Sequence, residues 1–378
     1  MKIFYLFIIL LSLCWSCSSE VKPDLKSENT AKASEVLSDK HFRIKDSLEY
    51  KIIEVIEPFL NASIVERYLL YPKGTEEPQN IPATVKIAVP VDKVAINSTT
   101  HLGYINSIKQ SNSIRAVTNL KLYYDSSFTE RVNNDAVVSI GNRELNHEKL
   151  IKSEVDVLFS YAIDAASYKQ VKQLRALNQK VILISEYMEQ NPIVKSEWLK
   201  VFAAFYSEKE QKAADSICTQ VEENYNRIKM HAMLYSFSPK VMIGLPWKGT
   251  WYVSGGESFQ AKLIRDANAN YIWHSYRQTG SVPLDIETAI NNGLDADFWI
   301  NPGIIQLKKD LAIKHQNFKD FKSFNSNRIF SNYFKSNEFG ANDYWESAVV
   351  RPDLVLQDLV SIFHDQAPDS LTYYKVLE

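Results

Sequence analysis

The longest helical signal in the chain is SEKEQKAADSICTQVEENYNRIKMHAMLY, residues 207–235. Its apolar positions recur at steps of three and four, as one buried stripe on a helix requires. These positions are Ala214, Ile217, Val221, Tyr225, Ile228 and Ala232. Ser207 followed by Glu210 indicates a capping box at the start, and Pro239 ends the pattern. Arg227, Lys229 and His231 lie in the late turns, where cations suit the helix dipole.

A helix over residues 208–235 would be about 40 Å long, which is more than the width of one small domain. There is no glycine or proline between Ile193 and Ser238, and alternating strand and helix patterns lie on either side. We therefore predict a linking helix at 207–238 between two α/β lobes, at 41–206 and 239–378. An ordinary long core helix has the same periodicity.

The composition agrees with two domains, because 378 residues exceed what one hydrophobic core usually supports. Hydrophobic residues make up 45% and charged residues 23% of the chain, as in ordinary globular proteins. The net charge of −2 argues against nucleic acid as a partner. With 20 Tyr, 18 Phe and 7 Trp, the chain also has aromatic residues for a binding surface.

The first residues resemble a bacterial lipoprotein signal. A basic start, Met1 and Lys2, precedes an apolar run at 3–13 that is too short to span a bilayer. Cys17 follows the small residue Ser16, as a lipidated cysteine does, although Cys14 and Trp15 depart from the usual pattern. We predict a signal peptide at 1–16, lipidation of Cys17 and a polar tether at 17–40, with a simple secretory signal as the alternative. The protein would then lie on the periplasmic face of a bacterial membrane.

The strand and helix patterns fall into two series. A hairpin is predicted at 50–57 and 63–71. Apolar runs follow at 85–89, 94–96, 114–117, 155–159 and 181–184, and the last two are nearly continuous, as parallel strands buried on both faces require. Helices are predicted between them at 101–109, 144–153 and 168–176. The second series has strands at 241–245, 271–273, 298–300 and 329–330, and helices at 257–267, 286–293 and 345–363.

Aromatic and hydrogen-bonding residues follow many of these strands. In open α/β sheets, ligands bind beyond the carboxyl ends of the strands. We therefore predict a cleft for a bulky, partly aromatic ligand, although any single aromatic side chain could instead cap the core. The candidate ligand-binding residues are Thr99, Thr100, His101, Tyr124, Tyr161, Trp247, Trp251, Tyr252, Arg277 and Tyr333.

Signatures of catalysis are missing from the sequence. The seven histidines form no cluster with metal-ligand spacing, so no dedicated metal site is predicted. Neither Gly-x-Ser-x-Gly nor His-Glu-x-x-His occurs. Cys218 would be the one thiol left after signal removal and lipidation, and buried packing suits it better than catalysis. We predict that the protein is not an enzyme.

Several segments between residues 86 and 367 follow one another in a characteristic order. They are DKVAINSTTH at 92–101, NHEKL at 146–150, DVLF at 156–159, DIE at 285–287, DADFWI at 295–300 and the closing segment 345–359. By the order of these segments, rather than by one motif, the chain resembles the iron-siderophore/cobalamin family of periplasmic substrate-binding proteins. The proline that usually precedes the 156–159 strand is replaced in the sequence SEVD at 153–156.

The resemblance implies a class III binding-protein fold, with two α/β lobes of parallel sheets joined by a single long helix. It implies a monomer, without a cofactor of its own, that delivers an iron chelate (siderophore or haem) or cobalamin to the permease and ATPase of an ABC importer. It also implies that Glu148 and Glu287 dock on permease arginines, where solvated helix-start glutamates are the alternative. An enzyme or chelatase on a similar scaffold, or a partner of a sensor or surface receptor, are the other interpretations.

Overall fold

The structure, a computed structural model, describes residues 40–142, 144–365 and 371–378. The predicted signal peptide, the lipidation site Cys17 and the tether up to residue 39 lie outside the described residues. Residues from Asp39 onward form one compact unit by their contacts.

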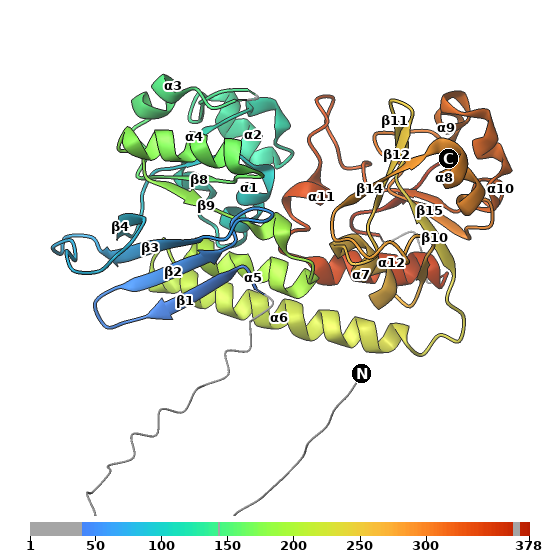
Figure 1. The fold of residues 1–378 in the computed structure, drawn as a ribbon, viewed down its shortest axis with the longest axis horizontal. Helices are drawn as coiled ribbons and strands as arrows, with labels where there is room; N and C mark the ends of the chain where they lie inside the picture. Colours follow the sequence, from blue (N-terminus) through green and yellow to red (C-terminus); the bar gives the residue numbers. More distant parts are fainter. Residues whose placement is uncertain (1–39, 143, 366–370) are drawn as a thin grey trace, which may run out of the picture. The chain divides into compact units, whose positions relative to one another are not determined.

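The long predicted helix is α6, Glu208–Ala232, which is drawn beneath both lobes in Figure 1. Its 25 residues give it a length of about 37 Å. Ala214 and Cys218 belong to one hydrophobic cluster, whereas Tyr225, Ile228 and Ala232 belong to another. The helix therefore connects two separate cores, as predicted.

The predicted capping box at the start of α6 is wrong. Ser207 is the N-cap residue, but its side chain makes no capping hydrogen bond to the backbone. Its Oγ donates instead to the carboxylate of Glu210. That carboxylate also accepts a hydrogen bond of 3.1 Å from Gln110. The two capping side chains thus bond to each other, and the Glu210 carboxylate also binds Gln110 of the first lobe instead of the N-cap backbone.

The first lobe is built on a parallel sheet in the order β7-β6-β5-β8-β9. All residues of β5 and β8 are buried, as expected for central parallel strands. The strands are β5 (Val94–Ile96), β6 (Ile114–Val117), β7 (Val138–Ser139), β8 (Val157–Ser160) and β9 (Val181–Leu183). The helices are α1 (Thr99–Ser107), α2 (Ser126–Asn133), α3 (His147–Lys152), α4 (Ala165–Ala176) and α5 (Pro192–Ala203).

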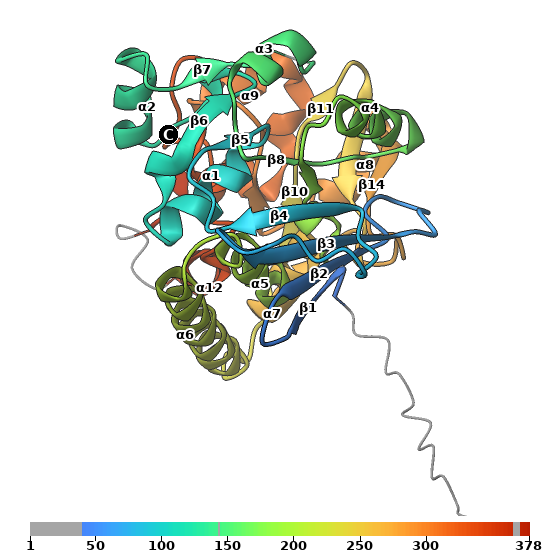
Figure 2. The ribbon, with the colours of Figure 1, turned by 90° about the vertical axis from the view of Figure 1, so that its left-hand side faces the viewer.

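A second sheet precedes this lobe in the chain and lies against it (Figure 2). Its strands are β1 (Phe42–Asp46), β2 (Lys51–Ile56), β3 (Val65–Pro72) and β4 (Val85–Val89). The predicted hairpin is confirmed as the antiparallel pair β2–β3. The apolar run at 85–89 is β4, which pairs in parallel with the edge of β3 that β2 leaves free.

A buried ion pair fastens this N-terminal sheet to the lobe. Glu66 on β3 is 2% exposed and lies 2.9 Å from a guanidinium nitrogen of Arg175 on α4. The hydroxyl of Tyr168 donates to Glu66 at 2.6 Å. The hydroxyl of Tyr68 accepts from the backbone N–H of Leu183 on β9. The sheet is therefore joined to both α4 and β9.

The second lobe has a five-stranded sheet in the order β13-β10-β15-β16-β17, parallel except for β17. The strands are β10 (Lys240–Ile243), β13 (Asn270–Tyr271), β15 (Phe298–Ile300), β16 (Ile329–Ser331) and β17 (Lys375–Val376). A separate antiparallel sheet consists of β11 (Pro246–Trp247), β12 (Thr250–Ser254) and β14 (Ser281–Asp285). The helices are α7 (Phe259–Asp266), α8 (Ile286–Gly293), α9 (Lys308–Lys314), α10 (Lys322–Asn325), α11 (Asp343–Glu346) and α12 (Pro352–Phe363).

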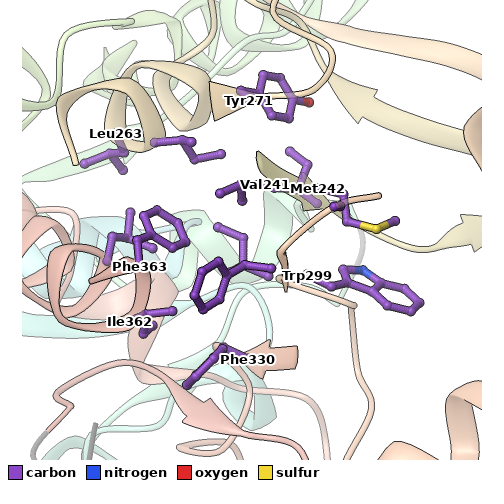
Figure 3. Close-up of a cluster of buried hydrophobic side chains, with 14 of the residues drawn as sticks. Val241, Met242, Leu263, Tyr271, Trp299, Phe330, Ile362 and Phe363 are labelled. Atoms are coloured by element: carbon purple, nitrogen blue, oxygen red, sulfur yellow. The ribbon is translucent and has the colours of Figure 1, made fainter. Parts of the chain in front are cut away.

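One part of the core of this lobe lies between its five-stranded sheet and helices α7 and α12 (Figure 3). Val241 and Phe330 come from the strands, while Leu263 and Phe363 come from the two helices. The ring of Phe298 lies 5.4 Å from that of Phe363 between centroids. Because this cluster and the first-lobe cluster are distinct, each lobe has its own core.

The single helix predicted at 345–363 is wrong. The chain forms the short helix α11 and then α12, which begins with Pro352. Arg351, between them, has φ −119° and ψ 54°, outside the helical region. Proline has no N–H to continue a helix and disfavours helical geometry in the residue before it, so it starts a new helix.

Residues 332–350, which we term the crossing segment, also connect the lobes. Tyr344 and Ala348 belong to the second-lobe cluster, whereas Val349 and Val350 belong to the first-lobe cluster. The carboxylate of Glu346 accepts hydrogen bonds from the backbone N–H groups of Tyr124 and Asp125, at 2.5 and 2.9 Å. The lobes are thus held together at α6 and again at the crossing segment.

Candidate functional site

A pocket of about 310 Å³ lies at the carboxyl ends of the first-lobe strands. Asn97 follows β5, Thr118 follows β6 and Tyr161 follows β8, and all three line it. The amide of Asn97 donates to the hydroxyl of Ser160 at 2.9 Å. Tyr161 and Ile163 are 40% and 59% exposed. The pocket thus offers aromatic, apolar, amide and hydroxyl groups to a ligand.

In the second lobe, the aromatic residues after β10 lie on a β-hairpin. Lys248 and Gly249 have φ of 49° and 86°, the signs required by a two-residue type I′ turn between β11 and β12. Because side chains alternate along a strand, Trp247 and Tyr252 lie on one face and Trp251 on the other. Trp247 is 62% exposed, with the Lys248 ammonium 4.5 Å from the centre of its ring.

Trp251 belongs to the core rather than to the ligand-facing surface. It is fully buried, and its indole N–H donates to the carbonyl of Ile243 at 3.1 Å. Its ring lies against those of Trp299 and Phe318. Lys248 and Gly249 are a turn signal in the sequence, but this signal does not show which face of the hairpin is buried.

His101 is also a core residue. It has no exposed surface, and its ring lies 5.5 Å from that of Phe202. Burial lowers its pKa to about 3, so the imidazole is neutral at physiological pH. The adjacent Thr100 donates to the buried carboxylate of Glu186 at 2.7 Å, and Thr99 is half-buried. Burial raises the pKa of Glu186, which the sequence did not single out as a candidate.

Three further candidates have partners within the chain. The side chain of Arg277 is 78% exposed and pairs with Glu257 at 2.6 Å. Tyr333 is half-buried, and its hydroxyl accepts from the indole of Trp345. Tyr124 is half-buried beside the Glu346 carboxylate, to which its backbone N–H donates.

Asparagine side chains follow strands in both lobes. Within the part of the chain that the structure describes, no partner is found for the buried amide oxygens of Asn97, Asn301 and Asn332. These residues follow β5, β15 and β16. Buried acceptors usually have a hydrogen-bond donor, so these oxygens favour a polar contact at the strand ends.

The predicted docking residues occupy matching positions. Glu148 lies in the first turn of α3, after the N-cap Asn146, and Glu287 lies in the first turn of α8, after the N-cap Asp285. Both are exposed. Glu148 pairs with Lys152 one turn later at 2.7 Å, so its carboxylate is accessible but not isolated.

A larger hollow of about 720 Å³ lies elsewhere in the second lobe, near α9 and α10. It shares no residue with the predicted ligand site. Over residues 40–142, 144–365 and 371–378, no set of three or more His, Cys, Asp or Glu is placed to hold a metal ion. Within the same ranges, no helix has the length and hydrophobicity needed to cross a membrane.

Two curated relatives are uncharacterised lipoproteins of Methanocaldococcus jannaschii. One is 25% identical over 291 residues, which cover 74% of this chain and 67% of the relative. The other is 24% identical over 250 residues and is covered over 61% of its length. The chain matches no family model.

Solved structures of periplasmic binding proteins are similar over most of the chain. A possible iron-binding periplasmic solute-binding protein of Staphylococcus epidermidis has a TM-score of 0.56 at 15% identity, with 72% of this chain and 99% of that one covered. A periplasmic heme binding protein of Pseudomonas aeruginosa gives 0.56 at 12% identity, with 76% and 98% covered. The chain has the class III periplasmic binding protein fold. A periplasmic vitamin B12 binding protein of Vibrio cholerae shares this binding-protein fold, with a TM-score of 0.52 at 9% identity and 73% and 98% covered.

Proposed function

We propose that this protein is an extracytoplasmic lipoprotein that binds an iron chelate or cobalamin between its lobes and delivers it to an ABC importer. The observation that carries the proposal is the presence of exposed aromatic side chains in both lobes: Tyr161 beside polar groups at the strand ends of the first lobe, and Trp247 with Tyr252 on the hairpin of the second. Large planar or aromatic ligands are bound by such surfaces. The binding-protein fold and the names of the similar structures support this ligand class.

The ligand class can be tested directly with the mature chain made without its signal. Native mass spectrometry and absorbance spectra after incubation with haem, cobalamin and ferric siderophores should yield one coloured one-to-one complex. A folded protein that binds none of them would contradict the proposal and favour an enzyme or receptor partner.

The role of the exposed hairpin face can be tested with Trp247→Ala. Loss of a central aromatic anchor should weaken ligand binding roughly tenfold or more, as measured by fluorescence titration. Phe237→Ala is a matched control, because Phe237 is 61% exposed but lies outside the proposed site. Equal affinities for Trp247→Ala and the parent would exclude Trp247 from the site.

Docking on the permease can be separated from ligand binding. Replacing both Glu148 and Glu287 with Ala should leave ligand affinity unchanged but abolish ligand uptake, because the paired carboxylates orient the complex. Glu208→Ala is a suitable control: like Glu148, it lies in a first helical turn and pairs with a lysine four residues later. Normal uptake by the double variant would rule out the docking role.

A further inference from the structure

Four large apolar side chains are exposed together at the end of α6 and in the turn after it. We term them the α6 patch: Met230, Met233, Leu234 and Phe237, which are 64%, 63%, 80% and 61% exposed. Single exposed apolar residues are common on protein surfaces, but a contiguous group usually marks an interaction site. This group shares no residue with the proposed ligand site.

The patch begins on the outer face of α6 and continues beyond the end of the helix. Tyr225, Ile228 and Ala232 face the second-lobe core. At about 100° per residue, Met230 lies on the opposite side of the helix axis, where a helix of a soluble domain normally has polar residues. Met233 is the C-cap of α6, and Leu234 lies in the turn that follows. The patch therefore contributes nothing to the core of the lobe that carries it.

The stretch of chain that carries the patch is basic, although Glu222 and Glu223 come directly before it. Between residues 224 and 240 the sequence contains Arg227, Lys229, His231 and Lys240 but no aspartate or glutamate. Lys229 is partly neutralised by Asp266, a buried carboxylate of α7 at 2.9 Å. Apolar side chains among cations, without acids, are the pattern of segments that lie at the interface of anionic membranes.

The described chain begins next to the helix that packs against α6. Lys40 pairs with Glu197, and the backbone N–H of His41 donates to Glu189 at 2.9 Å, so the described chain begins at α5. Helices α5 and α6 pack against each other. The 23 residues from Cys17 to Lys40 span at most about 80 Å, which exceeds the length of α6. A lipid on Cys17 can therefore reach a bilayer on which α6 lies.

We propose that the α6 patch inserts into the headgroup region of the anionic bilayer that carries the lipid anchor. The inference rests on the lipid anchor of the proposed function. In Figures 1 and 2, α3 with Glu148 lies on the opposite side of the described unit from α6. The membrane-bound protein would thus turn Glu148 away from its own membrane, and it must release the patch before it docks on a permease there.

Binding can be tested with the mature chain, residues 17–378, made without its signal and therefore without lipid. We expect it to co-float with vesicles of phosphatidylethanolamine and phosphatidylglycerol, more weakly at high salt and with phosphatidylcholine alone. The double variant Met233→Glu with Leu234→Glu should bind the vesicles at least about tenfold more weakly than the parent, because it removes apolar area and adds negative charge. Ile313→Glu is the matched control, because Ile313 is 81% exposed on α9.

Two results would overturn this inference. One is equal vesicle binding by the parent and the double variant, or none by either. The other is loss of self-association by the double variant with unchanged vesicle binding, which would make the patch a protein interface. Ligand titrations on the same preparations keep the two proposals apart: failed vesicle binding with intact ligand binding overturns only the membrane contact. Failed ligand binding with intact vesicle binding overturns only the proposed function.

Discussion

At the scale of single residues, the buried ion pair between Glu66 and Arg175 holds the N-terminal sheet on the first lobe. Glu66→Ala would leave the Arg175 guanidinium, 12% exposed, without its carboxylate. Removing one partner of a buried pair typically lowers the free energy of unfolding by about 3–5 kcal/mol. We expect a loss of this size for Glu66→Ala in urea unfolding.

The matched control for this prediction is Glu148→Ala. Its pair with Lys152 has side chains 77% and 73% exposed, and such pairs contribute at most about 1 kcal/mol. Equal stability of the two variants would show that the Glu66 pair does not fasten the sheet.

Glu346 should make stability depend on pH. Burial raises the pKa of its carboxyl group to about 7 from 4.5, with a smaller contribution from Asp125 and Asp343, although two backbone N–H groups favour the charged form. Between pH 4.5 and about 7, the folded protein therefore binds more protons than the unfolded chain does. The contribution of Glu346 to the free energy of unfolding is therefore greatest below pH 4.5 and falls, by up to about 3 kcal/mol, as the pH rises to 7.

Comparison with Glu346→Gln isolates this effect. Asp358, whose pKa is raised to about 6 by burial, and His41, whose pKa is raised by its hydrogen bond to Glu189, titrate in both proteins. The difference in unfolding free energy between parent and variant should therefore change between pH 4.5 and 7. Parallel stability curves over that range would contradict the prediction.

At the scale of elements, the long periodic segments were predictable and the short ones were not. The stripe of α6 repeats over many turns, and β8 and β15 are continuous apolar runs, so the patterns are unambiguous. The hairpin β11–β12 is only a few residues long and has aromatic residues on both faces, so the sequence shows no clear alternation of polar and apolar side chains. The side-chain bond of Ser207 to Glu210 depends on Gln110, a partner 100 residues away.

The contact between α1 and α11 provides a test at this scale. A Cβ atom at Gly103 would lie 1.8 Å from the carbonyl oxygen of Glu346, so α1 and α11 would have to move apart. We expect Gly103→Ala to lower the free energy of unfolding by about 1–3 kcal/mol, as overpacking does. Gly280→Ala is the control, because nothing lies within 4 Å of its added Cβ. Equal unfolding midpoints in urea would show that the helices adapt without cost.

At the scale of the whole molecule, the arrangement of two lobes was predictable because the stripe on α6 is longer than one core can bury. The crossing segment was not predictable. Its Glu346 contacts backbone groups of residues more than 200 positions earlier, and local sequence patterns carry no information on such pairs. The candidate site was predictable as a set of strand ends, but not residue by residue. His101 and Trp251 follow strands as Tyr161 and Trp247 do, and only the packing separates buried from exposed side chains.

The crossing segment should limit how far the lobes move. With α6 alone, the lobes could pivot about one helix, but the hydrogen bonds of Glu346 and of Asn337, which donates to the carbonyl of Tyr123, oppose such a motion. We predict a single narrow distance distribution between spin labels at Ile151→Cys on α3 and Ile313→Cys on α9, with little change on ligand binding. Both positions are exposed, whereas Cys218 is buried and its thiol pKa is raised to about 12, so it should not be labelled.

The variants that test this prediction carry the same two labels, with Cys17 replaced by Ala. Glu346→Ala together with Asn337→Ala should broaden the distance distribution. Glu346→Gln alone should broaden it less, because the amide oxygen still accepts hydrogen bonds. A distribution that is already broad in the parent would show that α6 alone sets the separation of the lobes.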